Sequence, residues 1–254
     1  MGATIKAVTF DLWDTIIHDD SDESKRAALG LRSKKDERRH LVWEALRRVS
    51  PIDRASVERA CDAADAAFDT AWHDQAITYP VGERIRQALQ FLGRSLPPYE
   101  LAAIVRAYEE MEITIQPDPV SGVADALAQL SRRYRLCVVS DTYVSPGRCL
   151  RRLLEAHDLT RYFSGFAFSD EVGRSKLHRA MFESAARQLG CEITEMIHVG
   201  DREHNDISGA RTLGMKAVLF TGARGSDPLA TAADAVCARH ADLPAVIDRL
   251  AGRP

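Results

Sequence analysis

Side chains that could carry out chemistry follow several short apolar runs of the sequence. The polar residues at or near the ends of these runs are Asp11, Asp14, Thr15, Ser140, Asp141, Lys176, Asp201 and Asp206. Carboxylates without neighbouring His or Cys ligands suit a hard cation such as Mg²⁺. Lysine and hydroxyl groups suit a phosphate group, and an aspartate facing phosphorus can act as a nucleophile. These residue types predict metal-assisted phosphoryl chemistry.

The elements that must position these residues form an alternating pattern. Short β-rich runs occur at 5–10, 134–139, 162–168, 196–199 and 217–220, and helical periodicity lies between the later ones, at 121–132, 146–157, 177–189 and 205–213. Alternation of strand and helix predicts a parallel α/β sheet covered on both faces. In such sheets, ligands bind beyond the carboxyl ends of the strands. The reactive residues are therefore expected to meet at one edge.

A long helical stretch separates the first strand from the others. Residues 18–35 are polar, and the acidic run at 19–23 predicts a solvated loop with at most a short helix. Residues 37–115 show helical periodicity throughout, with Ser56 as a candidate N-cap and Gly93 as a candidate stop. The simplest arrangement inserts this helical block after the first strand.

Bulk properties exclude several classes of protein. The chain has 254 residues and a net charge of −3, so it lacks the basic excess typical of nucleic-acid binders. Its five cysteines include no C-x-x-C pair, which fits free thiols in a reducing compartment. No apolar stretch is long enough to span a membrane. We expect a cytoplasmic protein without nucleic-acid or membrane partners, either a monomer or a homodimer.

Four runs, in order, carry a family resemblance. VTFDLWDT, VVSDT, GRSKLHRAMF and HVGDREHND resemble the four motifs of the haloacid dehalogenase-like (HAD) hydrolases over about residues 5–17 and 117–222. The resemblance implies a doubly wound, Rossmann-like α/β core with an inserted all-helical cap domain. The expected boundaries are 1–17 with 116–254 for the core, and 18–115 for the cap.

The resemblance also implies roles around a metal. Asp11 would be the nucleophile that forms an aspartyl-phosphate. Mg²⁺ would be held by Asp11, the carbonyl group of Trp13 and Asp201, with Asp206 supporting the metal's water ligands. The implied reaction is hydrolysis of a small phosphorylated metabolite.

The remaining motif residues are expected to contact the substrate. Ser140 and Lys176 would bind the transferring phosphoryl group, and Lys176 would also offset the charge of the carboxylates. Thr15 lies in the first-motif loop, Asp141 follows Ser140, and Trp13 is a candidate to line the substrate pocket.

One position departs from the family pattern. Phosphatases of this family usually carry a second Asp two residues after the nucleophile, as general acid and base, and here that position is Trp13. Asp14 comes one residue later; it is a candidate acid, but we favour a loop role in which it bonds local N–H groups. General acid–base help is typically worth about 10²–10⁴-fold in rate, so this departure matters.

Two alternative functions follow from Trp13. Members that cleave carbon–phosphorus or carbon–halogen bonds also lack the second Asp, although retention of Gly200-Asp201 argues against a dehalogenase. A catalytically weak HAD-fold protein that binds a ligand or partner is the other alternative.

Overall fold

The protein consists of two compact units. The computed structural model describes residues 4–224 and 230–253. One unit, here called the sheet unit, comprises Met1–Asp19, Pro117–Asp141 and Leu154–Pro254. The other, the helical unit, comprises Asp20–Gln116 and Thr142–Leu153. Each unit is described by itself below.

Six parallel strands form the centre of the sheet unit. They are β1 (Ala7–Phe10), β2 (Arg135–Ser140), β3 (Gly165–Phe168), β4 (Met196–Gly200), β5 (Lys216–Phe220) and β6 (Ala235–Cys237). Their order is β3-β2-β1-β4-β5-β6, and Phe10 pairs with Val138 on one side and Val199 on the other. The order reverses direction between β1 and β4. This is the topology of a doubly wound sheet, and it confirms the predicted fold class.

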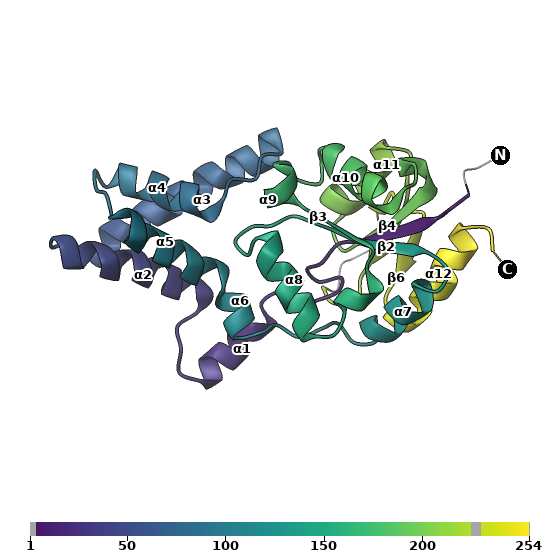
Figure 1. Ribbon diagram of the computed structural model, residues 1–254, viewed down its shortest axis with the longest axis horizontal. Coiled ribbons are helices and arrows are strands. Elements are labelled where there is room, and N and C mark those ends of the chain that lie inside the picture. Colours follow the sequence, from purple (N-terminus) through teal and green to yellow (C-terminus); the bar gives the residue numbers. More distant parts are fainter. Residues whose placement is uncertain (1–3, 225–229, 254) are drawn as a thin grey trace. The chain divides into compact units, whose positions relative to one another are not determined.

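Helices cover both faces of this sheet, which explains the apolar strand sequences. The helices lying wholly in this unit are α7 (Val123–Leu130), α9 (Ser169–Val172), α10 (Ala180–Leu189), α11 (Gly209–Thr212) and α12 (Leu243–Leu250). Helices α10 and α11 lie on one face and α7 and α12 on the other (Figure 1). Every residue of β1 is buried, as expected for a strand covered on both sides. Helix α8 (Gly147–Ala156) has residues in both units.

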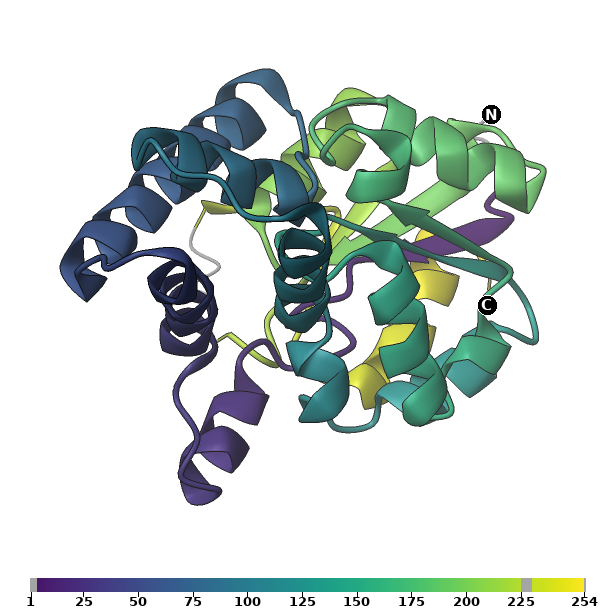
Figure 2. The same ribbon diagram turned by 60° about the vertical axis from the view of Figure 1, so that its left-hand side comes forward.

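The helical unit is built around four longer helices. Its helices before α8 are α1 (Ser21–Ala28), α2 (Lys34–Val49), α3 (Arg54–Gln75), α4 (Val81–Phe91), α5 (Pro98–Glu109) and α6 (Met111–Thr114). Helix α3 packs on α2 and α4, and α5 packs on α4 and α2, so the four close a ring. Figures 1 and 2 both show α3 and α4 side by side. Buried side chains from all four helices, among them Val42, Ala64, Ile85 and Ile104, form its core.

Several details of the helical unit differ from the sequence-based expectations. Asp53, and not Ser56, is the N-cap of α3, since its side chain accepts a hydrogen bond from the Ser56 N–H. Asp22, predicted to be solvated, is fully buried, where its carboxylate lies 2.9 Å from Lys34 Nζ. The pairing lets both charged groups leave water. Gly93 follows α4 with φ of +61°, as predicted for a helix stop.

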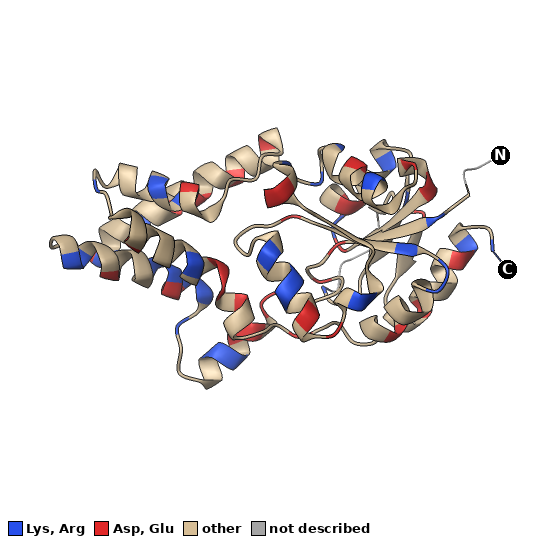
Figure 3. Cartoon of the chain, in the orientation of Figure 1, with Lys and Arg blue, Asp and Glu red and all other residues tan. Residues whose placement is uncertain are grey.

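Surface charge is mixed in both units. Figure 3 shows Lys and Arg residues interspersed with Asp and Glu along the helices. Among the described residues, no helix is both long and apolar enough to cross a membrane.

Candidate active site

The residues predicted to carry chemistry all belong to the sheet unit. Asp11 directly follows β1, Ser140 ends β2, and Asp201 directly follows β4. The strand order reverses between β1 and β4, and the crevice at such a point is where doubly wound sheets bind ligands. The backbone N–H of Asp11 donates to the carbonyl of Val199 on the neighbouring strand, at 2.8 Å. This bond fixes the start of the first-motif loop beside the end of β4.

Lys176 links two of the carboxylates. Its Nζ lies 2.5 Å from Asp11 Oδ1 and 2.6 Å from Asp206 Oδ1, and all three side chains are buried. Burial disfavours the charged ammonium, but the carboxylates of Asp11 and Asp206 outweigh it and raise the pKa of Lys176. Burial likewise opposes ionisation of Asp206, yet the nearby Lys176 charge overcomes it and lowers the pKa of that carboxyl group. Lys176 is therefore a permanent cation at the centre of the site.

Three carboxylates exceed the charge that this lysine can balance. Oxygens of Asp11, Asp201 and Asp206 all lie within 4.8 Å of one another. Burial, followed by repulsion from Asp11 and Asp206, raises the pKa of Asp201 to about 7. Asp201 Oδ1 is buried and has no hydrogen-bond partner within the described part of the chain. A cation placed among these oxygens would satisfy that atom and relieve the repulsion.

Asp206 is held rigidly from several sides. It lies in a turn of π-helix, Glu203–Ser208, a distortion that is frequent at functional sites. Its Oδ2 accepts the Arg202 N–H at 2.9 Å, and its Oδ1 lies 3.2 Å from His198 Nε2. His198 Nδ1 in turn pairs with the Thr9 hydroxyl at 2.9 Å, so this histidine is buried and both of its ring nitrogens have partners. A Cβ atom at Gly200 would overlap the Asp206 carboxyl group, which explains the glycine.

Asp141 positions the backbone around Lys176. Its Oδ1 accepts the Lys176 N–H at 2.9 Å, and its Oδ2 accepts Asn205 Nδ2 at 3.3 Å. Burial raises the pKa of Asp141 to about 6, which the Lys176 charge partly opposes. Ser140 is buried beside it, and its hydroxyl donates to the Asp141 carbonyl at 3.3 Å. That long bond leaves the Ser140 hydroxyl available to a ligand.

The first-motif loop turns sharply after Asp11. Asp14 has φ of +52°, a left-handed conformation that Asp tolerates, and its Oδ1 accepts the Asp19 N–H at 3.0 Å. Thr15 is buried, its hydroxyl has no partner among the described residues, and its carbonyl oxygen pairs with His240 Nε2 at 2.7 Å. Trp13 is half-buried. Asp14 is thus engaged in holding the loop.

Two further residues reach the site without having been predicted. Arg224, on the loop after β5, places Nη1 3.3 Å from Asp201 Oδ2 and Nε 3.7 Å from Asp14 Oδ2. Nothing in the sequence near Arg224 signals this role. Asn205 contacts Asp141, and its place beside Asp206 in the fourth motif was the available signal.

Comparison with known proteins decides the family. The model of the haloacid dehalogenase-like hydrolases matches residues 5–214. The chain belongs to this family. It is therefore an enzyme of the hydrolase class, and the resemblance drawn from its four motifs is confirmed.

Named relatives of this HAD hydrolase include phosphatases and dehalogenases. Glyceraldehyde 3-phosphate phosphatase of Pyrococcus furiosus is 28% identical over 222 residues, 85% of this chain and 80% of that protein. The HAD hydrolase YfnB of Bacillus subtilis, solved bound to magnesium, superposes with a TM-score of 0.61 at 15% identity, over 96% of this chain and 99% of that one. The 2-haloacid dehalogenase of Pseudomonas syringae gives 0.61 at 21% identity, over 97% and 99%.

The fold of a HAD hydrolase therefore does not distinguish a phosphatase from a dehalogenase. The structural matches are below 25% identity and establish the shared architecture alone. The relatives at higher identity carry phosphatase names. The choice of reaction must come from the residues at the site.

Proposed function

We propose that this HAD hydrolase is a magnesium-dependent phosphatase that transfers the phosphoryl group of a small metabolite to water through Asp11. One observation carries the proposal: Asp11, Asp201 and Asp206 cluster around Lys176, and a buried oxygen of Asp201 lacks a partner. A surplus of buried carboxylates is costly without a cation. Metal-assisted phosphoryl transfer requires such carboxylates to bind the cation, whereas dehalogenation without a metal does not.

The donor set fits Mg²⁺. Carboxylate oxygens of Asp11 and Asp201 would hold the ion together with the Trp13 carbonyl, and Asp206 would support its water ligands. Only oxygen donors take part, which is the preference of this hard cation. When bound, the ion neutralises charge on the phosphate oxygens and orients the phosphoryl group.

The protein's own residues account for the first half of the reaction. An Asp11 oxygen attacks phosphorus, the bond to the ester oxygen breaks, and the leaving group departs with the electron pair. Lys176 holds Asp11 Oδ1 at 2.5 Å, which orients the nucleophile and offsets negative charge. The Ser140 hydroxyl would exchange its long bond to the Asp141 carbonyl for one to a phosphate oxygen.

In the second half, water attacks phosphorus and releases phosphate from Asp11.

Leaving-group protonation, in the first half, is the step for which this chain lacks its family's usual acid. Trp13 occupies that position, and Asp14 is bound to the Asp19 N–H and lies near Arg224. We therefore propose substrates whose leaving groups are stable as anions, such as acyl or aryl phosphates.

Trp13 supports one other candidate. Family members that cleave carbon–phosphorus or carbon–halogen bonds also lack the second Asp, so Trp13 is compatible with that chemistry. Metal-independent release of halide, or release of phosphate from a phosphonate and not from an ester, would select it. We also propose that the protein is cytoplasmic and that its partner is a phosphorylated small molecule. We propose that it is a monomer or a homodimer, and light scattering distinguishes these two states.

The test pairs two Asp→Asn variants of the sheet unit. Asp201→Asn removes a proposed ligand, and Asp125→Asn changes an exposed aspartate in the first turn of α7. Mg²⁺ affinity is measured by calorimetry, and hydrolysis of p-nitrophenyl phosphate is followed with and without EDTA. We expect Asp201→Asn to weaken Mg²⁺ binding beyond the roughly 10–100-fold that loss of an outer-shell partner costs. Activity should fall with it, while Asp125→Asn retains both.

Two results would refute the proposal. Wild-type hydrolysis that is unaffected by EDTA would remove the metal from the reaction. Mg²⁺ binding without turnover of aryl, acyl or alkyl phosphates would favour a binding protein.

A further inference from the structure

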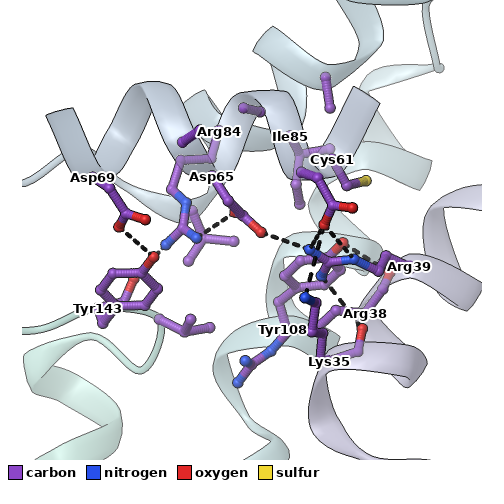
Figure 4. Close-up of a pocket in the computed structure, with 16 residues that line it drawn as sticks. Lys35, Arg38, Arg39, Cys61, Asp65, Asp69, Arg84, Ile85, Tyr108 and Tyr143 are labelled. Atoms are coloured by element: carbon purple, nitrogen blue, oxygen red, sulfur yellow. Dashed lines mark hydrogen bonds and ion pairs between the residues drawn. The ribbon is translucent and has the colours of Figure 1, made fainter. Parts of the chain in front are cut away.

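The helical unit contains a cavity of its own. Its volume is about 480 Å³, within the range of sites for small molecules, and all of its lining residues belong to this unit. Apolar side chains such as Val81, Ile85 and Ala88 form one part of the wall. Charged residues from α2, α3 and α4 form another, with Tyr108 and Tyr143 beside them (Figure 4). A mixed wall of this kind suits a ligand with one charged group and an uncharged remainder.

Two of the lining arginines are neutralised within the protein. Figure 4 shows Asp65 between Arg39 and Arg84, whose Nη2 atoms lie 2.9 and 2.5 Å from its two oxygens. Arg84 also donates to the Tyr143 carbonyl at 2.6 Å, and its guanidinium lies 4.3 Å from the centre of the Phe68 ring. These guanidinium groups are fixed and fully used, so they shape the wall.

Arg38 differs from both. It lines the same cavity, and its Nε atom is buried without a hydrogen-bond acceptor. Within residues 4–224 and 230–253, no carboxylate forms an ion pair with its guanidinium group. Glu112 is the carboxylate that most favours the Arg38 charge, but it is bound to Lys34 and to the Ser145 hydroxyl. The residue as a whole is half-buried, so it is the Nε–H donor that has lost water without gaining an acceptor, which is unfavourable.

The other polar groups of the wall do not compensate for this charge. Lining cations are Lys35, Arg38, Arg39 and Arg84, and lining carboxylates are Asp62, Asp65 and Asp69. Asp69 accepts the Tyr143 hydroxyl at 2.6 Å, and Asp62 pairs with Arg39. The Tyr108 hydroxyl donates to the backbone carbonyl of Arg38 at 2.8 Å, which fixes this part of α2. The lining residues therefore carry one more positive than negative charge.

We propose that this cavity binds a small organic anion, whose carboxylate or phosphate group pairs with the Arg38 guanidinium while its remainder lies against the apolar wall. The planar guanidinium matches both anions through paired N–H donors, which makes it the residue suited to such recognition. The proposal is independent of the phosphatase proposal, because it concerns residues of the helical unit alone.

The test compares two arginines of the same helix. Arg38→Met removes the charge that lines the cavity. Arg48→Met is the control: Arg48 lies near the end of α2, and its side chain is 69% exposed. Malonate and inorganic phosphate are titrated separately into the full chain with EDTA present, and binding is measured by calorimetry. We expect Arg38→Met to weaken binding by about ten- to a hundredfold, the change expected for losing charge-assisted hydrogen bonds. Arg48→Met should bind as the wild type does.

The two anions and a third variant sharpen the result. Malonate binding without phosphate binding identifies a carboxylate ligand, and the reverse identifies a phosphate ligand. Arg38→Lys keeps the charge but loses the fork of donors, so it should retain only part of the affinity. Without anions, Arg38→Met should melt at the wild-type temperature or above, because it removes a half-buried charge that has no ion-pair partner.

Three outcomes would overturn the proposal. Wild-type protein could bind neither anion. Arg38→Met could bind both as tightly as the wild type does, which would place the binding elsewhere. Arg38→Met could melt well below the wild type without any anion, which would show that Arg38 serves the fold.

Discussion

The two units treat buried charge in opposite ways. In the sheet unit, Asp11, Asp201 and Asp206 cluster around the buried cation Lys176, and an Asp201 oxygen lacks a partner. In the helical unit, Asp62 and Asp65 together neutralise Arg39 and Arg84. The cation without an ion-pair partner there is Arg38, whose Nε atom is buried.

The difference concerns what each unit still lacks. A bound cation would stabilise an excess of buried carboxylates, and a bound anion would stabilise an excess of guanidinium groups. Buried ion pairs that are complete, such as those of Asp65, maintain the fold. Those that are incomplete indicate where a ligand would lower the free energy of the protein.

The largest expected effect tests the carboxylate excess directly. Asp11→Asn should reduce phosphatase turnover by about 10⁴-fold or more, the scale seen when a nucleophile is removed. Because the change also removes one of the repelling carboxylates, the folded protein should be as stable as the wild type or more so. Initial rates and thermal unfolding measure the two effects. Activity within tenfold of wild type would exclude Asp11 as the nucleophile.

The next prediction concerns the position two residues later. Trp13→Asp should raise the rate on alkyl phosphates more than on aryl phosphates, by up to the roughly 10²–10⁴-fold typical of a general acid. An alkoxide needs a proton as it leaves, whereas a phenolate is stable as an anion. Trp13 is half-buried, so unfolding must be compared with the wild type first. If the folded variant hydrolyses both classes no faster than the wild type does, a carboxyl group at this position does not act as the general acid.

How much of this could be predicted from the sequence depends on the range of the interactions. The strands β1, β2, β4 and β5 and the residues at their ends follow from local apolar runs. Strand β6 was not predicted, because its three residues, Ala235–Cys237, give no periodic signal. The burial of Asp22 was missed for a different reason: its partner Lys34 lies 12 residues away, and sequence shows charge but not pairing.

The site itself shows the same limit. Asp11, Lys176, Asp201 and Asp206 stand in motifs with fixed spacing, so their roles were predictable from resemblance and stay predictions until tested. Arg224 contacts Asp201 and Asp14 through a loop with no pattern. The cavity beside Arg38 is lined by residues of α2, α3, α4 and α5 together with Tyr143 and Val144, so no single segment encodes it.

A third prediction uses pH to act on the sheet unit. Burial lowers the pKa of His240 from 6.5 to about 4, although its bond to the Thr15 carbonyl opposes this. A depressed pKa in the folded state stabilises the protein above pH 6.5, and that stability is lost as pH falls toward 4. The loss attributable to His240 should approach about 3 kcal/mol near and below pH 4.

The control for this prediction is His240→Phe, which keeps the stacking on Phe220 and removes the titrating group. Urea unfolding of both proteins is measured between pH 4 and 7.5. The wild type should be the more stable at pH 7.5, and the gap should narrow as pH falls. A gap that is constant with pH would mean that His240 does not titrate between the folded and unfolded states.

The smallest effect completes the comparison between the two units. Asp65→Asn removes the carboxylate that pairs with both Arg39 and Arg84, whose side chains are each 9% exposed. Breaking a fully buried pair costs about 3–5 kcal/mol, and because Asp65 is itself 32% exposed we expect a loss of about 2 kcal/mol. Asp62→Asn is the matched control: Asp62 also pairs with Arg39 but is 57% exposed, so its loss should cost about 1 kcal/mol or less.

The sign of this change distinguishes the two kinds of buried charge. Neutralising Asp65 should destabilise the protein, because Arg84 loses its carboxylate and Arg39 keeps only the more exposed Asp62. Neutralising Asp11 should not, because burial, together with repulsion from Asp206, outweighs its pairing with Lys176 and raises the pKa of that carboxyl group. Urea unfolding at pH 7.5 in EDTA measures all three variants under the same conditions. If Asp65→Asn is no less stable than Asp62→Asn, the helical unit does not depend on its internal pairs. The lack of an ion-pair partner at Arg38 would then not indicate a ligand site, because a guanidinium group without a carboxylate partner would not destabilise this unit.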